Sequence, residues 1–210
     1  MLQPLMSKLA GKRIVLASGS PRRKEILDRV GLHFEVIPST FKEDLDKSTF
    51  TPEDYVKETA RHKTLEVAER LTGQNEPDLI IGADTVVALG DRILEKPVNE
   101  KAAFEMLSAL SGNTHKVHTG VVLICPKLQG GGNQPFNIIQ FHETTEVIFG
   151  DLSPEVINAY ISSEEPMDKA GGYGIQALGG TLVKGIVGDY FNVVGFPLHH
   201  FCCKLVDIFR

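Results

Sequence analysis

An apolar run that leads straight into a capped helix start constrains the beginning of this chain most strongly. Residues 14–16 (IVL) read as a strand, and residues 17–27 (ASGSPRRKEIL) read as a tight turn followed by a helix. Ser20 is a preferred N-cap residue, and Pro21 suits the first helical position. The free amides of that first turn would point back toward the end of the strand, and this geometry attracts anions.

Two arginines, Arg22 and Arg23, stand at the same helix start. Each places a cation where the helix dipole is already positive, at a cost of roughly 0.3–1 kcal/mol. A bound polyanion would reverse that cost. Taken alone, the stretch is compatible with two interpretations: a capped surface helix with solvated arginines, or an anion-binding site.

Strands and helices alternate through most of the chain, which predicts an α/β fold with a mixed sheet. A hairpin with a glycine tip around Gly130 is expected in the second half, and no internal repeat is present. Helices are expected after the caps Ser20, Thr51, Asn99 and Ser153, and from Pro197 onward. Strands are expected at 14–16, 34–37, 78–82, 83–89, 115–125, 137–149, 182–186 and 190–194.

The bulk composition excludes several classes of protein. With 210 residues and 42% hydrophobic residues, the chain can bury a sizeable core. A net charge of -5 argues against a nucleic-acid binder that works by bulk electrostatics. No apolar run approaches the ~18 residues of a membrane span, and residues 1–12 are too polar for a signal peptide. Three cysteines, an odd number, fit a reducing cytoplasm. The net charge and the lack of a long apolar run together predict that neither nucleic acid nor a membrane is a partner.

Familiar catalytic motifs are absent or incomplete. The chain has neither a P-loop sequence nor a G-x-S-x-G elbow. Residues 172–177 (GYGIQA) match a relaxed dinucleotide pattern, but no apolar strand precedes them, and a loop that closely approaches a ligand is the better interpretation. His115 and His118 lack the partners of a zinc site, so structural roles are favoured for both. Cys202 and Cys203 are interpreted as packing or surface residues.

Polar residues at the ends of the expected elements form the remaining candidate site. Asp84 lies among apolar neighbours, so its carboxylate requires a partner: a charge, a hydrogen bond or a metal. Arginine, lysine and carboxylate side chains together suit a metal-bound polyphosphate. This composition favours phosphate binding but does not name a reaction. The residues are Ser18, Ser20, Arg22, Arg23, Glu43, Lys63, Asp84, Lys96, Asp168, Lys169 and Gln176.

Several motifs in fixed order resemble the Maf-like nucleotide pyrophosphatases, and they cover nearly the whole chain. The first is the A-S-x-S-P-R-R-x-E-x-L string at 17–27. It is followed by F-x-V-x-P-S (34–39), Glu43, A-x-x-K (60–63), A-D-T-x-V (83–87), L-x-K-P (94–97), M-L-x-x-L-S-G (106–112), H-x-V-x-T-G (115–120), D-K-A-G-x-Y-x-I-Q (168–176) and N-V-V-G-x-P-L (192–198). Glu95, where many relatives have glycine, and the longer tip at Gly130 depart from the pattern.

The resemblance implies a Maf/ITPase-like fold: an elongated mixed sheet with flanking helices that form two lobes around a nucleotide cleft. Residues 1–210 would form a single Maf-like domain. The implied activity is hydrolysis of a nucleoside triphosphate to the monophosphate and pyrophosphate with Mg²⁺ or Mn²⁺. A homodimer is expected. The run at 168–180 looks especially like the branch in which a methyltransferase-like domain follows the Maf-like domain. Nothing in the 210 residues resembles a methyl-donor site, so the chain is expected to be either a separated first domain or a stand-alone relative.

The resemblance also implies a role for each motif residue. Asp84 would orient or deprotonate the attacking water beside the metal, and Glu43 would help to hold the metal or the sugar. The pattern of Lys63, Lys96 and Gln176 resembles the branch that prefers pyrimidines, dTTP and UTP. A module that binds nucleotides without turnover is the alternative, and the presence of Asp84 favours the enzyme. Substrate-binding roles fall to Ser18, Ser20, Arg22, Arg23, Glu43, Lys63, Lys96, Lys169 and Gln176.

Overall fold

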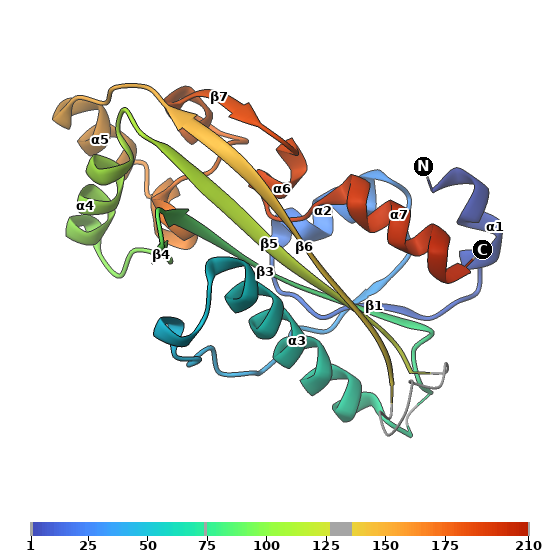
Figure 1. Ribbon diagram of the computed structural model, residues 1–210. Helices are drawn as coiled ribbons and strands as arrows, with labels where there is room; N and C mark the ends of the chain where they lie inside the picture. Colours follow the sequence, from blue (N-terminus) through green and yellow to red (C-terminus); the bar gives the residue numbers. More distant parts are fainter. Residues whose placement is uncertain (1, 74, 127–135, 210) are drawn as a thin grey trace.

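A long mixed β-sheet is the frame of the molecule (Figure 1). The computed structural model describes residues 2–73, 75–126 and 136–209. Within them the sheet has seven strands in the order β2-β1-β3-β5-β6-β7, and β4 also pairs with β3. β1 is parallel to β2 and β3, whereas the other pairs are antiparallel. The predicted α/β fold with a mixed sheet is confirmed.

The bounds of the elements follow the sequence signals closely. The strands are β1 (Ile14–Leu16), β2 (Glu35–Val36), β3 (Leu79–Leu89), β4 (Arg92–Leu94), β5 (Thr114–Cys125), β6 (Asn137–Phe149) and β7 (Val183–Val187). The helices are α1 (Met6–Leu9), α2 (Pro21–Arg29), α3 (Pro52–Leu71), α4 (Glu100–Leu110), α5 (Pro154–Ile161), α6 (Tyr190–Val194) and α7 (Leu198–Phe209). Ser20, Thr51, Asn99 and Ser153 each cap a helix, as predicted, by accepting a backbone N–H.

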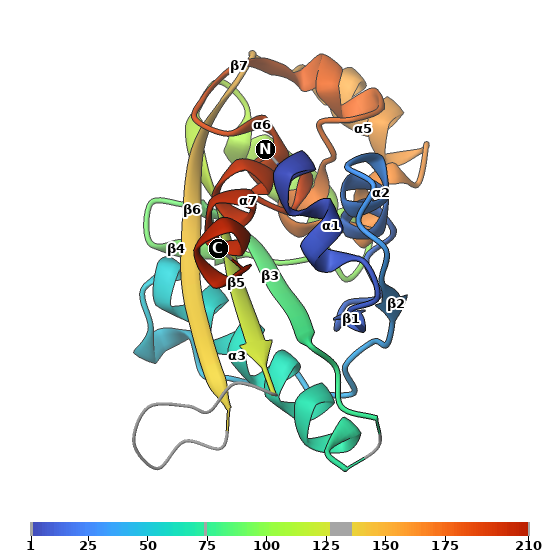
Figure 2. The ribbon, with the colours of Figure 1, turned by 90° about the vertical axis from the view of Figure 1, so that its right-hand side faces the viewer.

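Two groups of helices give the molecule its predicted lobes. At one end α1, α2 and α7 pack around a core that includes Leu27, Phe196 and Phe201, and Figure 2 shows these helices beside one another. At the other end α4, α5 and β7 pack around a second core that includes Leu107 and Phe149. β3, β5 and β6 run between the two ends (Figure 1). Among the described residues, no helix is long and apolar enough to cross a membrane.

α3 lies directly on β3 and β5 because two glycines leave room for it. A Cβ atom on Gly82 would overlap the side chain of Thr64, and one on Gly120 would overlap the Val56 carbonyl and lie 2.7 Å from the backbone nitrogen of Lys57. Even-numbered residues of β3 around Gly82 face α3, while the alternate residues face α2 and α7. Close contact with this helix therefore requires glycine at both positions.

Three strand expectations need correction or qualification. Residues 190–194, expected as a strand, form α6, because Asp189 accepts the N–H of Phe191 as an N-cap and Gly195, with φ 123°, ends the helix. The two runs expected at 78–82 and 83–89 form one continuous strand, β3. The hairpin of β5 and β6 is confirmed, but its expected tip around Gly130 lies outside the described residues.

The two histidines of β5 have structural roles, as predicted. His115 is buried, pairs with the Tyr173 hydroxyl at 2.8 Å and packs edge-on against Phe149. Burial lowers the pKa of His115 to about 4, so the ring is neutral at physiological pH. His118 is buried and pairs with the Thr144 hydroxyl at 2.9 Å. Cys202 is buried on α7 and Cys203 is exposed.

The contact between α3 and the sheet predicts an asymmetry between two glycines. Gly120→Ala should lower the free energy of unfolding by roughly 1–3 kcal/mol, because the added methyl group has to displace the backbone of α3. Gly185→Ala on β7 is the matched control, since a Cβ atom there meets nothing within 4 Å. Urea unfolding of both variants gives the comparison. Equal stability of the two variants would contradict the close contact.

Candidate active site

One cleft of about 760 Å³ lies between the two lobes. All ten residues predicted to bind or cut the substrate line it, although they come from segments far apart in the sequence. These are Ser18, Ser20, Arg22, Arg23, Glu43, Lys63, Asp84, Lys96, Lys169 and Gln176. The structure therefore brings the predicted residues together, while the role of each remains a prediction.

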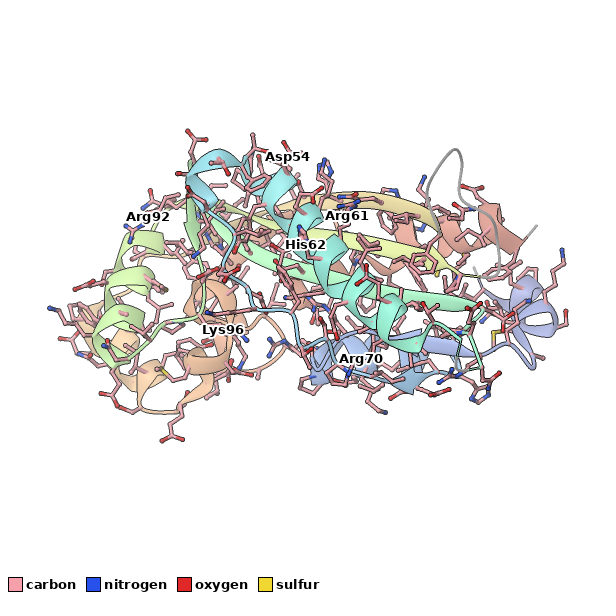
Figure 3. All side chains as sticks on the ribbon, turned by 90° about the horizontal axis from the view of Figure 1, so that it is seen from below. Asp54, Arg61, His62, Arg70, Arg92 and Lys96 are labelled. Carbon is pink, nitrogen blue, oxygen red and sulfur yellow. The ribbon has the colours of Figure 1, made fainter. Side chains whose placement is uncertain are left out.

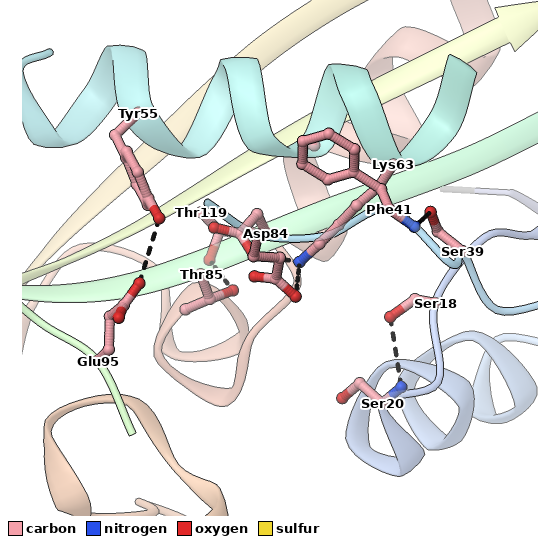
Figure 4. Close-up of polar contacts among 12 residues, drawn as sticks. Ser18, Ser20, Ser39, Phe41, Tyr55, Lys63, Asp84, Thr85, Glu95 and Thr119 are labelled. Carbon is pink, nitrogen blue, oxygen red and sulfur yellow. Dashed lines mark hydrogen bonds and ion pairs between the residues drawn. The ribbon is translucent and has the colours of Figure 1, made fainter. Parts of the chain in front are cut away.

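The start of α2 forms one wall of the cleft. The Ser20 side chain accepts the backbone N–H of Arg23 at 3.4 Å, and the Ser18 hydroxyl accepts the backbone N–H of Ser20 at 3.3 Å (Figure 4). The loop and helix start therefore have the capped form that the sequence predicts. The side chain of Arg22 is partly exposed and pairs with Asp168 of the other lobe at 3.3 Å.

The two neighbouring arginines have different surroundings. In contrast to Arg22, Arg23 is buried, with 9% of its surface exposed. Its Nε donates to the Gly195 carbonyl at 2.9 Å, Nη1 donates to the Ser18 hydroxyl at 3.0 Å, and Nη2 donates to the Thr85 hydroxyl at 2.9 Å. Burial lowers the pKa of Arg23, while the charge of Asp84 opposes that effect.

A buried carboxylate stands at the centre of the cleft. Asp84 on β3 is 7% exposed, and its Oδ1 accepts from the Nζ of Lys63 on α3 at 2.7 Å (Figure 4). The same Nζ lies 2.8 Å from Glu43. Burial raises the pKa of Asp84, and the charges of Lys63 and Arg23 partly oppose that rise. Asp84 therefore has the partner that its apolar setting in the sequence requires.

The segment that carries Glu43 is fixed to α3 by one carboxylate. Glu66 accepts the Ser39 hydroxyl at 2.9 Å and both the N–H and the hydroxyl of Thr40 at 3.0 Å. The next residue, Phe41, lines the cleft and stacks on His62, with ring centroids 5.0 Å apart. These contacts bring Glu43 to Lys63, although residues 39–46 form neither helix nor strand.

The far wall of the cleft comes from the second lobe. Lys169 donates to the Glu165 carbonyl and to Asp168, both at 2.6 Å, and Gln176 is exposed toward the cleft. Lys96 is exposed after β4 (Figure 3). The neighbouring residue, Glu95, departs from the family motif and makes two contacts of its own. It pairs with Lys47 at 2.6 Å and accepts a hydrogen bond from the Tyr55 hydroxyl at 3.2 Å (Figure 4).

Sequence reasoning missed Thr85 and the Gly195 carbonyl. The Thr85 hydroxyl accepts from Arg23 and also lies 2.9 Å from the Thr119 hydroxyl and 3.3 Å from the Gly195 carbonyl. Threonine is common in strands, so Thr85 carries no signal of its own. The available clue was its place in the A-D-T-x-V motif at 83–87, directly after Asp84.

The fold and the cleft together define a class: an α/β protein in which a capped helix start with two arginines lines the same cleft as a buried, lysine-paired carboxylate. The family model described as Maf-like protein matches residues 13–208. The chain therefore belongs to the Maf-like family.

Several proteins similar to this chain have names that include a pyrophosphatase activity. The chain is 54% identical over 213 residues to a human protein named probable bifunctional dTTP/UTP pyrophosphatase/methyltransferase protein; this covers all of the chain but only 34% of the human protein. It is 49% identical over 187 residues to a dTTP/UTP pyrophosphatase of Clostridium perfringens, covering 89% of the chain and 92% of that protein. A Bacillus cereus protein of the same name is 46% identical over 187 residues, covering 89% of the chain and 85% of that protein.

The pairing of Lys63 with Asp84 predicts a change in titration. Lys63→Met should raise the pKa of Asp84 further. The buried carboxylate would lose its nearest cation, while the burial that raises its pKa would stay the same. A raised native pKa means that the native state holds the proton longer, so the variant should lose stability relative to wild type as pH rises above about 3.9. Carbon-detected NMR titration of the Asp84 carboxyl measures the pKa. Lys42→Met, at an exposed lysine, is the control; an unmoved Asp84 pKa in Lys63→Met would refute the prediction.

Proposed function

We propose that this protein is a nucleoside triphosphate pyrophosphatase that hydrolyses dTTP and UTP to the monophosphate and pyrophosphate. Three relatives that share 46–54% identity carry this activity in their names. The observation that carries the proposal is the placement of Asp84. A buried, lysine-paired carboxylate lines the same cleft as a capped helix start with an exposed arginine.

The triphosphate would bind at the start of α2. The backbone N–H of Arg22, in the first helical turn, and the hydroxyl of Ser20 can donate to phosphate oxygens, and the positive end of the helix dipole favours the anion. Arg22 can exchange Asp168 for a phosphate, because their ion pair is largely exposed and such pairs contribute little. This arrangement holds the β- and γ-phosphates, which leave together as pyrophosphate.

Asp84 would act as the general base. Its carboxylate takes a proton from a water molecule whose oxygen attacks the α-phosphorus, and the bond from that phosphorus to the bridging oxygen breaks as pyrophosphate leaves. The raised pKa of Asp84 makes it a better base than a solvated aspartate, while Lys63 keeps it ionised. Lys63 also orients the carboxylate by a hydrogen bond from one side.

A divalent cation, Mg²⁺ or Mn²⁺, fits the chemistry of the available donors. Asp84 and Glu43 supply two carboxylates that meet at Lys63, and Mg²⁺ commonly uses one or two carboxylates together with substrate phosphates. Within the described ranges, no group of three or more His, Cys, Asp or Glu residues could hold a metal alone. The substrate would therefore complete the coordination. The cation would neutralise charge that develops on the phosphate oxygens.

The second lobe would recognise the base and sugar. Gln176 offers both a donor and an acceptor, and Lys96 and Lys169 add positive charge at the same wall of the cleft. The pattern of Lys63, Lys96 and Gln176, which resembles the pyrimidine-preferring branch of the family, supports the preference for pyrimidines. We further propose that residues 1–210 act as one unit in the cytoplasm and that the protein forms a homodimer. The unit is either a stand-alone protein or the first domain of a longer one, as in the human relative whose name includes a methyltransferase.

Pyrophosphate release from a panel of triphosphates tests the proposal. The panel contains dTTP, UTP, CTP, dATP and GTP, each with Mg²⁺, with Mn²⁺ and with a chelator. We expect release from dTTP and UTP that requires the cation and exceeds release from the purine nucleotides. Binding without release at any metal concentration would instead indicate a nucleotide-binding module without turnover.

Replacement of the proposed base separates binding from catalysis. Asp84→Asn should lower kcat by at least about 100-fold, because the amide cannot accept the proton from water. Nucleotide binding should persist, since the α2 start and Arg22 are unchanged. Single-turnover kinetics and calorimetry measure the two quantities. Near-wild-type turnover by Asp84→Asn would show that another group is the base.

A further inference from the structure

Arg23 uses three of its nitrogen atoms to join three separate segments of the protein. Nη1 contacts Ser18 in the loop after β1, Nη2 contacts Thr85 on β3, and Nε contacts the carbonyl of Gly195 between α6 and α7. A guanidinium presents its donors in a rigid planar fork, so three simultaneous bonds fix the relative positions of these segments. Arg22, by contrast, pairs with the exposed carboxylate of Asp168 at 3.3 Å.

Thr85 continues this contact into a chain of buried polar groups. Its hydroxyl lies 2.9 Å from the Thr119 hydroxyl, which donates to the Asn192 carbonyl at 3.3 Å. The Asn192 amide nitrogen in turn donates to the Val117 carbonyl and to the Thr145 hydroxyl, both at 3.0 Å. Asn192 and Thr119 are fully buried. The position of the guanidinium is therefore set by β3, β5, β6 and α6 together.

The Thr85 hydroxyl is already engaged by protein groups on several sides. A hydroxyl donates one hydrogen bond and accepts at most two. The Thr85 oxygen has three polar neighbours: Arg23 as a donor, the Thr119 hydroxyl and the Gly195 carbonyl. An effect of Thr85 on catalysis would thus act through the position of its neighbours.

Position matters here because Thr85 and Asp84 are adjacent on β3. Neighbouring strand residues emerge on opposite faces, so Asp84 contacts Lys63 of α3 while Thr85 contacts Arg23 of α2. The bond from Arg23 to Thr85 is thus a direct tie between the helix whose first turn receives the phosphates and the strand that carries the base. A displacement of about 1 Å between reacting groups can cost about 100-fold in rate.

We propose that Arg23 and Thr85 form a positioning pair that sets the distance from the phosphate-binding start of α2 to Asp84, and that Arg22 rather than Arg23 is the arginine that grips the triphosphate. This inference rests on the proposed pyrophosphatase function. It assigns different tasks to two arginines that the sequence presents as equivalent.

Thr85→Val tests the pair without removing a charge. Valine keeps the shape and strand preference of threonine but cannot accept from Arg23. We expect kcat for dTTP to fall about 10- to 100-fold, while the Kd of a non-hydrolysable triphosphate, measured by calorimetry with and without Mg²⁺, stays close to wild type. Thr85→Ser, which keeps the hydroxyl, should recover most of the lost rate. Thr72→Val is the matched control, because its hydroxyl donates to the Ala68 carbonyl at the end of α3.

A second variant distinguishes positioning from direct phosphate binding by Arg23. Arg23→Lys keeps the charge but cannot make the three-way contact. It should lower kcat with little change in Kd, and Arg23→Lys combined with Thr85→Val should be no slower than the worse single variant, because both remove the same tie. Arg22→Lys should instead raise Kd. Thermal unfolding of each variant checks that the fold persists.

The outcomes separate the inference from the function on which it rests. A wild-type protein that releases no pyrophosphate overturns the proposed function and the inference with it. An active wild type with Thr85→Val as fast as Thr72→Val overturns the inference alone. An Arg23→Lys variant that loses affinity rather than kcat also overturns it, since Arg23 would then grip the phosphates. A loss of kcat restored by Thr85→Ser supports the positioning pair.

Discussion

The ion pair of Asp84 and Lys63 is the contact on which the rest of the structure depends. A carboxylate in the middle of a buried strand stays ionised only if a cation reaches it, and here the cation comes from a helix that crosses the sheet. That helix can approach closely because Gly82 and Gly120 present no side chain to it. Gly82 and Gly120 thus allow α3 to bring Lys63 close enough to pair with the buried Asp84.

A second buried charge, Arg23, lies on the opposite face of the same strand. Its field favours the ionised form of Asp84, and Asp84 favours the charged form of Arg23. Each charge therefore offsets part of the desolvation cost of the other through the sheet, although the two side chains belong to different layers. β3 receives a tie from α3 on one face and a tie from α2 on the other. The strand that carries the candidate base is held from both sides.

The sequence predicted the elements well where local signals agree, and less well where they conflict. Capped helices such as α3 combine an N-cap, an early proline and a helical period, so they are recognised without tertiary information. Residues 190–194 (YFNVV) have strand-forming side chains, yet the cap at Asp189 and the turn at Gly195 make them α6. Family motifs located ten residues that the fold brings to one cleft. They could not separate Arg22 from Arg23, because burial and partners are properties of the folded chain.

The cleft contains two kinds of charged contact, and the difference between them follows from solvent. Arg22 and Asp168 form a partly exposed ion pair between the lobes, and Lys47 forms another with Glu95, which lines the cleft. Such pairs contribute about 0–1 kcal/mol, so a triphosphate can displace them at little cost. Arg23 and Lys63 make shielded contacts, and loss of a partner there would leave a buried charge uncompensated. A polyanion that enters the cleft would therefore rearrange the exposed ion pairs and leave the buried contacts in place, so Asp84, the proposed base, stays fixed while Arg22, proposed to hold the substrate, exchanges its partner.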